Sequence, residues 1–257
     1  TKLISASRTG SYFNAAGVTP GINTKGSWVP YASAISSTGP AATGIILLLR
    51  SSTTASGVDT ATIMDIGVRI SSVDYLIIPN IAVGFRSNNR ICHYIPMHIP
   101  PGAQVIARAS GTRNPAVAFN IHVEIVGGES ASALSVPTKF TDYGTDTANS
   151  GGTAITPNAT ANTKGSWVEL TASTTAVIHE MLVGYQLSTA TQGTATTYMF
   201  DIGVGGSGSE QVVVSNIPFI CTNTENIQDA YPLRLPFSFD IPTGSRLSAR
   251  VQCDVAS

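Results

Sequence analysis

The sequence predicts an all-β protein made of two tandem jelly-roll-like antiparallel β-sandwich domains that arose by an internal duplication. Hydrophobic residues make up 42% of the 257 residues and charged residues only 11%. This composition can supply a packed core but not the charged surfaces of helices. Short β-branched or aromatic segments alternate with clusters of Gly, Pro, Asn or Ser. A series of motifs also occurs twice in the same order, which indicates a duplicated domain.

The hexapeptide NTKGSW is the most distinctive of these repeats. It begins at Asn23 and again at Asn162, an offset of 139, and it contains both tryptophans of the chain, Trp28 and Trp167. We expect each tryptophan to open an early strand and to fill the core of its unit, because large aromatic side chains dominate β-sandwich cores. A ligand-binding platform is the alternative.

Further matches follow the same order along the chain and define the boundaries of the repeat. They are MDIGV with FDIGV (Met64 and Phe200, offset 136), Pro79 with Pro218 (offset 139), and IPPGAQVIAR with IPTGSRLSAR (Ile99 and Ile241, offset 142). The slow drift of the offset indicates loop insertions after a duplication. We therefore expect unit one at residues 1–127, a linker at 128–137 and unit two at 138–257.

The expected strands of unit one are short and regularly spaced, as in sandwiches and barrels. Their ranges are 44–50, 61–70, 74–85, 91–99, 103–109 and 116–126. About eight strands in each unit would fit a jelly roll or a similar Greek-key sandwich.

The repeated DIGV and IP-x-G motifs are expected to be structural anchors of both units. A glycine inside a strand pattern indicates a bulge, and the aspartate next to it can accept bonds from neighbouring backbone N–H groups. In IP-x-G, the proline and glycine predict the turn that leads into the strand beginning at Ala103 or Ser245. A role in ligand binding is the alternative. The anchor residues are Asp65, Asp201, Gly67, Gly203, Pro100 and Pro242.

The two units differ in charge and in apolar pattern. Unit one with the linker has nine Lys or Arg and five Asp or Glu (net +4), whereas unit two has five and ten (net −5). Such asymmetry indicates different partners, or packing of one unit on the opposite unit of a neighbouring subunit. An uninterrupted apolar run also favours a strand covered on both faces, either by its own chain or by another subunit. Because the outer face of a sandwich is usually covered by another subunit, we expect a homo-oligomer with this run at the interface. The interface candidates are Ile45, Ile46, Leu47, Leu48 and Leu49.

Unit two ends before a counterpart of the strand expected at 116–126. Three explanations remain open at the level of sequence. They are a chain that continues beyond Ser257, a neighbouring segment that adds a strand, and one shorter strand at residues 249–255 with Cys253 in or beside the core.

Motifs for catalysis are lacking, so we expect no enzyme and no catalytic, cofactor-binding or metal-binding residues. The nearest candidate for a metal site is Cys92, His93 and His98, but the two histidines would face opposite sides of an extended strand. Three scattered cysteines favour reduced thiols rather than a disulfide framework. A net charge of −1 predicts neither nucleic acid nor a membrane as partner.

Residues 201–219, DIGVGGSGSEQVVVSNIPF, are preceded by GSWVEL and followed by IPTGSRLSARVQ. This pattern resembles repeats in tandem-repeat jelly-roll-like virion structural proteins of tailed bacteriophages. The resemblance covers most of unit two and is weaker in unit one, which lacks the GSEQ segment. It implies a virion component assembled in the host cytoplasm, such as a head (capsid) decoration, spike or tail-associated protein, with other capsid or tail proteins as partners. By analogy with other jelly-roll virion proteins, it also implies that the expected homo-oligomer is a trimer. A receptor- or carbohydrate-binding module of a tail fibre, with a host-surface glycan as ligand, is the alternative.

Overall fold

The protein is described from a computed structural model, which covers residues 2–4, 17–30, 41–51, 60–85, 90–112, 119–127, 140–185, 196–221 and 233–255. These residues form β-strands and one short 3-10 turn, η1 (Thr147–Asn149), and contain no α-helix. The prediction of an all-β sandwich fold is therefore confirmed.

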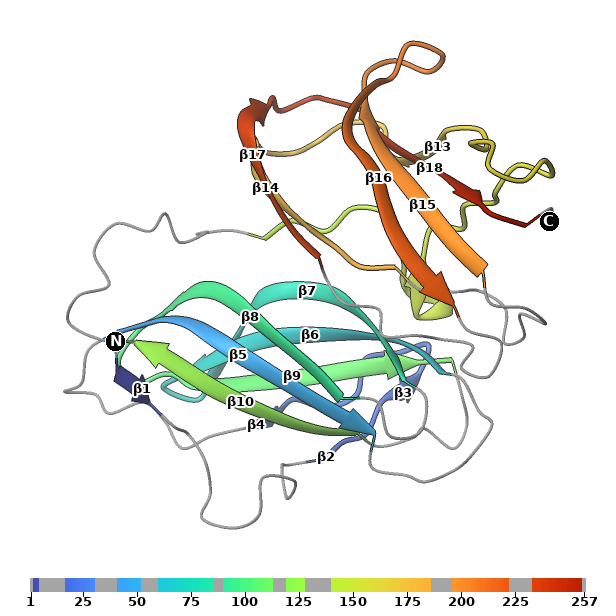
Figure 1. The fold of residues 1–257 in the computed structure, drawn as a ribbon. Coiled ribbons are helices and arrows are strands. Elements are labelled where there is room, and N and C mark those ends of the chain that lie inside the picture. Colours follow the sequence, from blue (N-terminus) through green and yellow to red (C-terminus); the bar gives the residue numbers. More distant parts are fainter. Residues whose placement is uncertain are drawn as a thin grey trace.

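Unit one is a sandwich of two sheets, drawn in blue to green in the lower part of Figure 1. The first sheet has the order β1-β10-β5-β8, with β2 paired to β10; the strands are β1 (Lys2–Ile4), β2 (Gly17–Val18), β5 (Ala42–Ser51), β8 (Arg90–Ile99) and β10 (Phe119–Gly127). The second has the order β3-β9-β6-β7, with β4 paired to β9; the strands are β3 (Gly21–Ile22), β4 (Val29–Pro30), β6 (Thr60–Ile70), β7 (Val73–Phe85) and β9 (Gln104–Gly111).

Unit two lies above unit one in Figure 1, in yellow to red. Its larger sheet has the order β13-β18-β15-β16, with β13 (Val168–Thr171), β15 (Thr196–Val204), β16 (Gln211–Cys221) and β18 (Leu247–Cys253). Two smaller sheets pair β14 (Ile178–Val183) with β17 (Leu233–Ile241), and β11 (Thr145–Asp146) with β12 (Gly151–Gly152). Every strand pair described lies within one unit.

Alternation along the strands divides each large sheet into a core face and an outer face. On β6, Met64, Ile66 and Val68 belong to the core of unit one, together with Ile45 and Leu47 from the opposite sheet. Successive side chains of a strand point to opposite faces. The residues between the core positions, among them the aspartate and glycine of DIGV, therefore lie on the outer face.

The large sheets of the two units have the same strand register. In unit one, Gly67 pairs with Leu76 after a shift of register in β7. In unit two, Gly203 pairs with Val212 after the same kind of shift in β16. Both pairs of positions differ by 136. This register corrects one match made from sequence: the counterpart of Pro218 is Ala82 and not Pro79, because Ala82 pairs with Ile63 as Pro218 pairs with Met199.

The run 45–49 lies in β5, which is flanked by β10 and β8. Ile45 is 0% and Leu47 1% exposed, while Ile46 is half-buried. The side chains of Leu48 and Leu49 lie outside the described residues. The role of this strand in an oligomer interface remains a prediction.

The C-terminal segment forms β18, in which Cys253 is buried and unbridged. This agrees with the expectation of one strand ending near the core. However, β18 pairs with β13 and β15, as β9 pairs with β4 and β6. It therefore corresponds to β9 and does not replace β10, for which unit two has no counterpart among the described strands.

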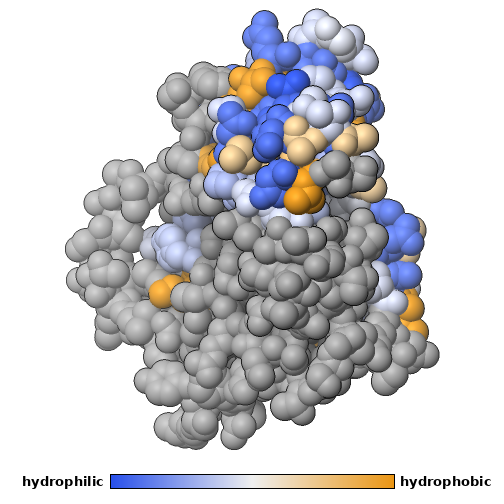
Figure 2. All heavy atoms as spheres, turned by 45° about the vertical axis from the view of Figure 1, so that its right-hand side comes forward, coloured by the Kyte–Doolittle hydropathy of each residue, from blue (hydrophilic) through white to orange (hydrophobic). Residues whose placement is uncertain are grey.

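The face of unit two that is drawn in Figure 2 is mostly polar. Figure 2 shows hydrophilic residues over the upper part of the molecule, with hydrophobic ones scattered among them. Single exposed apolar residues of this kind are usual on folded proteins.

Candidate functional site: a carboxylate network repeated on two sheets

Each NTKGSW segment, which we call the strap, runs along one strand of a large sheet, β9 in unit one and β18 in unit two. In unit one, the backbone N–H of Asn23 donates to the carbonyl of Gly111, and that of Gly26 donates to the carbonyl of Ala109, both at 2.9 Å. The strap is thereby fixed to β9. The corresponding bonds of unit two join Asn162 to Cys253 (2.7 Å) and Gly165 to Val251 (2.8 Å).

The glycine of the strap is required by a close approach of the backbone. A Cβ atom on Gly26 would lie 2.6 Å from the carbonyl oxygen of Thr19, and one on Gly165 would lie 2.5 Å from that of Thr156. Backbone atoms cannot move aside as a flexible side chain can. The strap therefore closes on a preceding Thr-Pro segment only with glycine at this position.

The lysine of the strap in unit one binds the aspartate of DIGV. Lys25 Nζ lies 2.8 Å from Asp65 Oδ1, and Arg108 Nε, from β9, lies 2.9 Å from Asp65 Oδ2. The backbone N–H of Asn80, from β7, also donates to Asp65 Oδ1 at 3.0 Å. Asp65 is only 3% exposed, so these three donors replace its hydration.

Unit two repeats this arrangement atom for atom. Lys164 Nζ lies 2.8 Å from Asp201 Oδ1, Arg250 Nε lies 2.9 Å from Oδ2, and the N–H of Asn216 donates to Oδ1 at 2.8 Å. Asp201 is 2% exposed. Asn80 and Asn216 both have φ of 51°, a left-handed conformation that asparagine tolerates better than most residues. That conformation lies at the bulge beside each carboxylate.

The tryptophans lie on the outer face and not in the core, which corrects the sequence-based expectation. Both are half-buried. A Cβ atom on Gly67 would lie 3.1 Å from the Trp28 ring, and one on Gly203 would lie 2.8 Å from the Trp167 ring. The glycine of DIGV thus leaves space on the outside of the sheet, and the indole ring occupies it.

The arginine of each network also covers the indole ring. Arg108 Cζ is 4.5 Å from the centroid of Trp28, and Arg250 Cζ is 4.4 Å from that of Trp167. A guanidinium group at this distance is attracted by the face of the ring. One arginine therefore links the carboxylate of DIGV to the tryptophan of the strap.

Burial and hydrogen bonding act in opposite directions on the ionisable groups of the networks. Burial raises the pKa of Asp201, but hydrogen bonds from Lys164, Asn216 and Arg250 outweigh it and hold the pKa below its usual value of 3.8. Burial lowers the pKa of Lys25 from 10.5, although its bond to Asp65 opposes that change. The aspartate of unit two is therefore an ionised acceptor at neutral pH.

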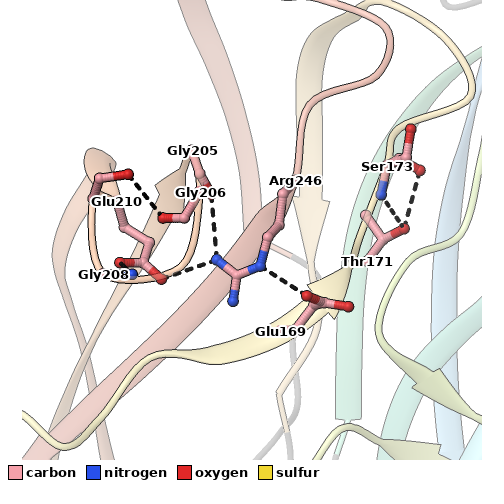
Figure 3. A network of polar contacts seen from close by, with 9 residues as sticks. Glu169, Thr171, Ser173, Gly205, Gly206, Gly208, Glu210 and Arg246 are labelled. Atoms are coloured by element: carbon pink, nitrogen blue, oxygen red, sulfur yellow. Dashed lines mark hydrogen bonds and ion pairs between the residues drawn. The ribbon is translucent and has the colours of Figure 1, made fainter.

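A second network in unit two holds the Gly-rich loop between β15 and β16 (Figure 3). Arg246 donates from Nε to Glu169 Oε2 (2.7 Å) and from Nη1 to Glu210 Oε1 (2.9 Å) and the Gly205 carbonyl (3.3 Å). The N–H of Gly208 donates to the other oxygen of Glu210, at 2.9 Å. The carboxylate of Glu210 therefore binds a backbone N–H within the loop, and Arg246 connects the loop to Glu169 on β13.

The IP-x-G motifs form turns before β9 and β18. The N–H of Ala103 donates to the Pro100 carbonyl at 3.2 Å, and that of Ser245 donates to the Pro242 carbonyl at 3.3 Å. Gly102 and Gly244 have φ of 78° and 86°. A positive φ at the third position is that of a type II turn, which needs glycine there.

The geometry favours a stabilising role for these networks. Both oxygens of Asp65 and of Asp201 are engaged by donors, which is how a buried charge is stabilised rather than how a general base is exposed. Within the described ranges, no group of three His, Cys, Asp or Glu residues could hold a metal ion. The side chains of Cys92 and His93 lie outside these ranges, and His98 is exposed. The described segments include no helix that could span a membrane.

The two units touch through β7. The side-chain amide of Asn80 donates to Asp142 Oδ2 at 2.9 Å, and Thr145 Oγ1 donates to the other oxygen of Asp142 at 2.6 Å. Phe140 and Leu182 of unit two pack against the core of unit one. The network in unit one is thus directly joined to the first residues of unit two.

Comparison with known proteins assigns no family to the chain. No protein-family model matches it, and no curated protein is significantly similar to it. Among solved structures, the chain is similar to the PBSX exported protein XepA, at 7% identity and a TM-score of 0.26 over 93% of this chain and 85% of that protein. A likeness at this level assigns neither fold nor function.

Proposed function

We propose that the protein is a virion structural component of a tailed bacteriophage, acting as a head decoration, spike or tail-associated protein. Its proposed partners are further copies of itself, as a trimer, and other capsid or tail proteins. The proposed role is mechanical and not enzymatic.

One observation carries this proposal. The motifs by which unit two resembles phage virion repeats are GSW, DIGV, GSEQ, GSR and AR, and the networks are built from one residue of each: Trp167, Asp201, Glu210, Arg246 and Arg250. The resemblance therefore rests on residues that fix the outer face of a sheet. A particle that persists outside its host needs such a surface to resist local unfolding.

We further propose that units one and two derive from one ancestral domain. The support is the shared register at offset 136 and the matching donors around Asp65 and Asp201. Both sheets have three donors to the aspartate, an arginine over the tryptophan ring and a glycine that leaves space for that ring. Independent origin of all of these in one chain would require many unrelated coincidences.

A receptor- or carbohydrate-binding module of a tail fibre is the second candidate. It is favoured by the exposed tip of the β6–β7 hairpin, where Val73, Tyr75 and Leu76 are 51%, 49% and 49% exposed. Exposed aromatic rings of this kind stack on apolar ligand faces. A glycan array that shows specific binding, lost in Tyr75→Ala, would support this function over a purely structural one.

Quantitative mass spectrometry of purified particles tests the proposed function. A decoration protein is expected at hundreds of copies in each particle, and a tail-associated protein at a few or tens. Absence of the chain from washed particles of the phage that encodes it would contradict the proposal.

A further inference from the structure

The contact between the units places the outward face of β14 on the edge strand β7. Leu182 packs against the core of unit one, and a Cβ atom on Gly184 would lie 2.9 Å from the Cβ atom of Ala82. The hydrogen bond from Asn80 to Asp142, at 2.9 Å, belongs to the same contact between the units. Unit one therefore provides a docking surface for unit two at Asn80 and Ala82 on β7.

Ile46 occupies in unit one the place that Leu182 occupies in unit two. On β5, the core residue Ile45 pairs with Ile95, and Ile46 pairs with Tyr94. On β14, Met181, which packs against the core of unit two, pairs with Leu235, and Leu182 follows it on the opposite face. Ile46 is half-buried, and Tyr94 beside it is 39% exposed.

The docking surface at Asn80 and Ala82 also has an equivalent in unit two. Ala82 pairs with Ile63 on β6, and Pro218 pairs with Met199 on β15, at the shared offset of 136. Asn80 and Ala82 are half-buried beneath unit two, whereas the corresponding Asn216 and Pro218 are exposed. The same position on β16 is therefore accessible in the described part of the chain.

We propose that the face of β5 and β8 carrying Ile46 and Tyr94 packs on β16 at Asn216 and Pro218 of a second copy. This contact repeats between chains the packing of unit two on unit one. It rests on the proposed duplication and names the interface of the proposed oligomer. The net charges of the two sequence halves, +4 and −5, favour contact between unlike units.

Such a contact is heterologous, because two different surfaces meet. Repetition then gives a closed ring or an open filament, and closure at three copies would give the trimer expected from the sequence. Because the two surfaces belong to separate chains, the contact depends on concentration.

Light scattering of the full chain at a series of concentrations tests this contact, because it measures the molar mass in solution. The wild type should exceed its monomer mass of 26.6 kDa. Ile46→Glu and Pro218→Glu should each stay monomeric. Mixing these two variants should restore one intact surface of each kind and produce a one-to-one dimer that grows no further.

Matched variants keep the outcome interpretable. Tyr94→Asp alters the first surface at a more exposed residue and should reproduce Ile46→Glu with a wild-type melting temperature. Val73→Glu, at the remote hairpin tip, should assemble like the wild type. A wild type that is monomeric at the highest soluble concentration, a Pro218→Glu variant with wild-type mass, or a mixture that stays monomeric would each overturn the contact. None of these results alters the count of copies in purified particles, which tests the virion role separately.

Discussion

Arg250 lies over the face of Trp167 with its Cζ atom 4.4 Å from the ring centroid, and it binds Asp201 at 2.9 Å with its Nε atom. One planar group thus binds two partners, the indole ring and the carboxylate. Lysine carries the same charge but has neither the planar face nor the fixed fork of donors. The arrangement therefore predicts that charge alone is insufficient at this position.

Arg250→Lys should lower the free energy of unfolding by about 1 kcal/mol, because it loses the stacking and weakens the bond to Asp201. Urea unfolding followed by Trp167 fluorescence in a Trp28→Phe background reports on unit two alone. Arg108→Lys, followed through Trp28 in a Trp167→Phe background, should give a similar loss. Equal stability of wild type and Arg250→Lys would show that the stacking contributes nothing.

Asp201→Ala should cost about 3 kcal/mol, because Lys164 and Arg250 would be left partly buried without their common acceptor. Asp201→Asn keeps an acceptor for the N–H of Asn216 and should cost less. Thermal unfolding measures both variants. If Asp201→Ala were no less stable than Asp201→Asn, the carboxylate would not be the centre of the network.

Acid should destabilise unit two through Asp201. The pKa of Asp201 is lowered below 3.8 in the folded protein, so ionisation stabilises the folded state above the unfolded pKa. This stability is lost as the pH falls through the lower, folded pKa. The free energy of unfolding, measured from pH 7 to about pH 2, should fall below about pH 4, and the fall should be smaller in Asp201→Asn. The same acid dependence in both proteins would assign the effect to other groups.

Gly203→Ala should displace the indole ring of Trp167, because its Cβ atom would lie 2.8 Å and 2.9 Å from two ring carbons. We expect a loss of about 1–3 kcal/mol, the usual range for overpacking, and a red-shifted emission of Trp167 in the Trp28→Phe background. Gly206→Ala is the control, since the nearest atom to its Cβ is the Ser209 hydroxyl oxygen at 3.3 Å. Unshifted emission in Gly203→Ala would show that the ring does not depend on this slot.

Glu210→Ala should loosen the loop between β15 and β16, because Arg246 and the N–H of Gly208 both lose their buried acceptor. Hydrogen exchange at residues 205–210 should become faster than in the wild type. Glu169→Ala removes the other partner of Arg246, but that carboxylate is 48% exposed, and little change is expected. Faster exchange in Glu169→Ala than in Glu210→Ala would reverse this ranking.

The sequence predicted the all-β class because β-rich segments and turn residues are local signals. The DIGV aspartates were expected to bind nearby backbone N–H groups, and the N–H of Asn80 and Asn216 supply such bonds from the adjacent strand. Their ion pairs were missed. Lys25 and Asp65 are 40 residues apart, and a contact between distant segments leaves no local pattern. A usable signal was the recurrence of Lys25 and Arg108 as Lys164 and Arg250 in a chain poor in charges.

The expectation for the tryptophans failed for a physical reason. Large aromatic side chains usually fill cores, but the core faces of these sheets are filled by residues such as Met64 and Ile66. The space for the indole was created on the outer face by Gly67, whose importance to Trp28 depends on strand register. Pro79 was also matched wrongly with Pro218, because that match relied on residue type and not on strand register. The domain boundaries, the trimer and the interface at 45–49 stay predictions.

A reconstruction of the particle of the encoding phage, at a resolution that separates strands, tests the central claim most directly. The account predicts density for both units on the surface of the head or tail, with unit one of each copy against unit two of the next. Particles that are complete without density for this chain would contradict the virion role.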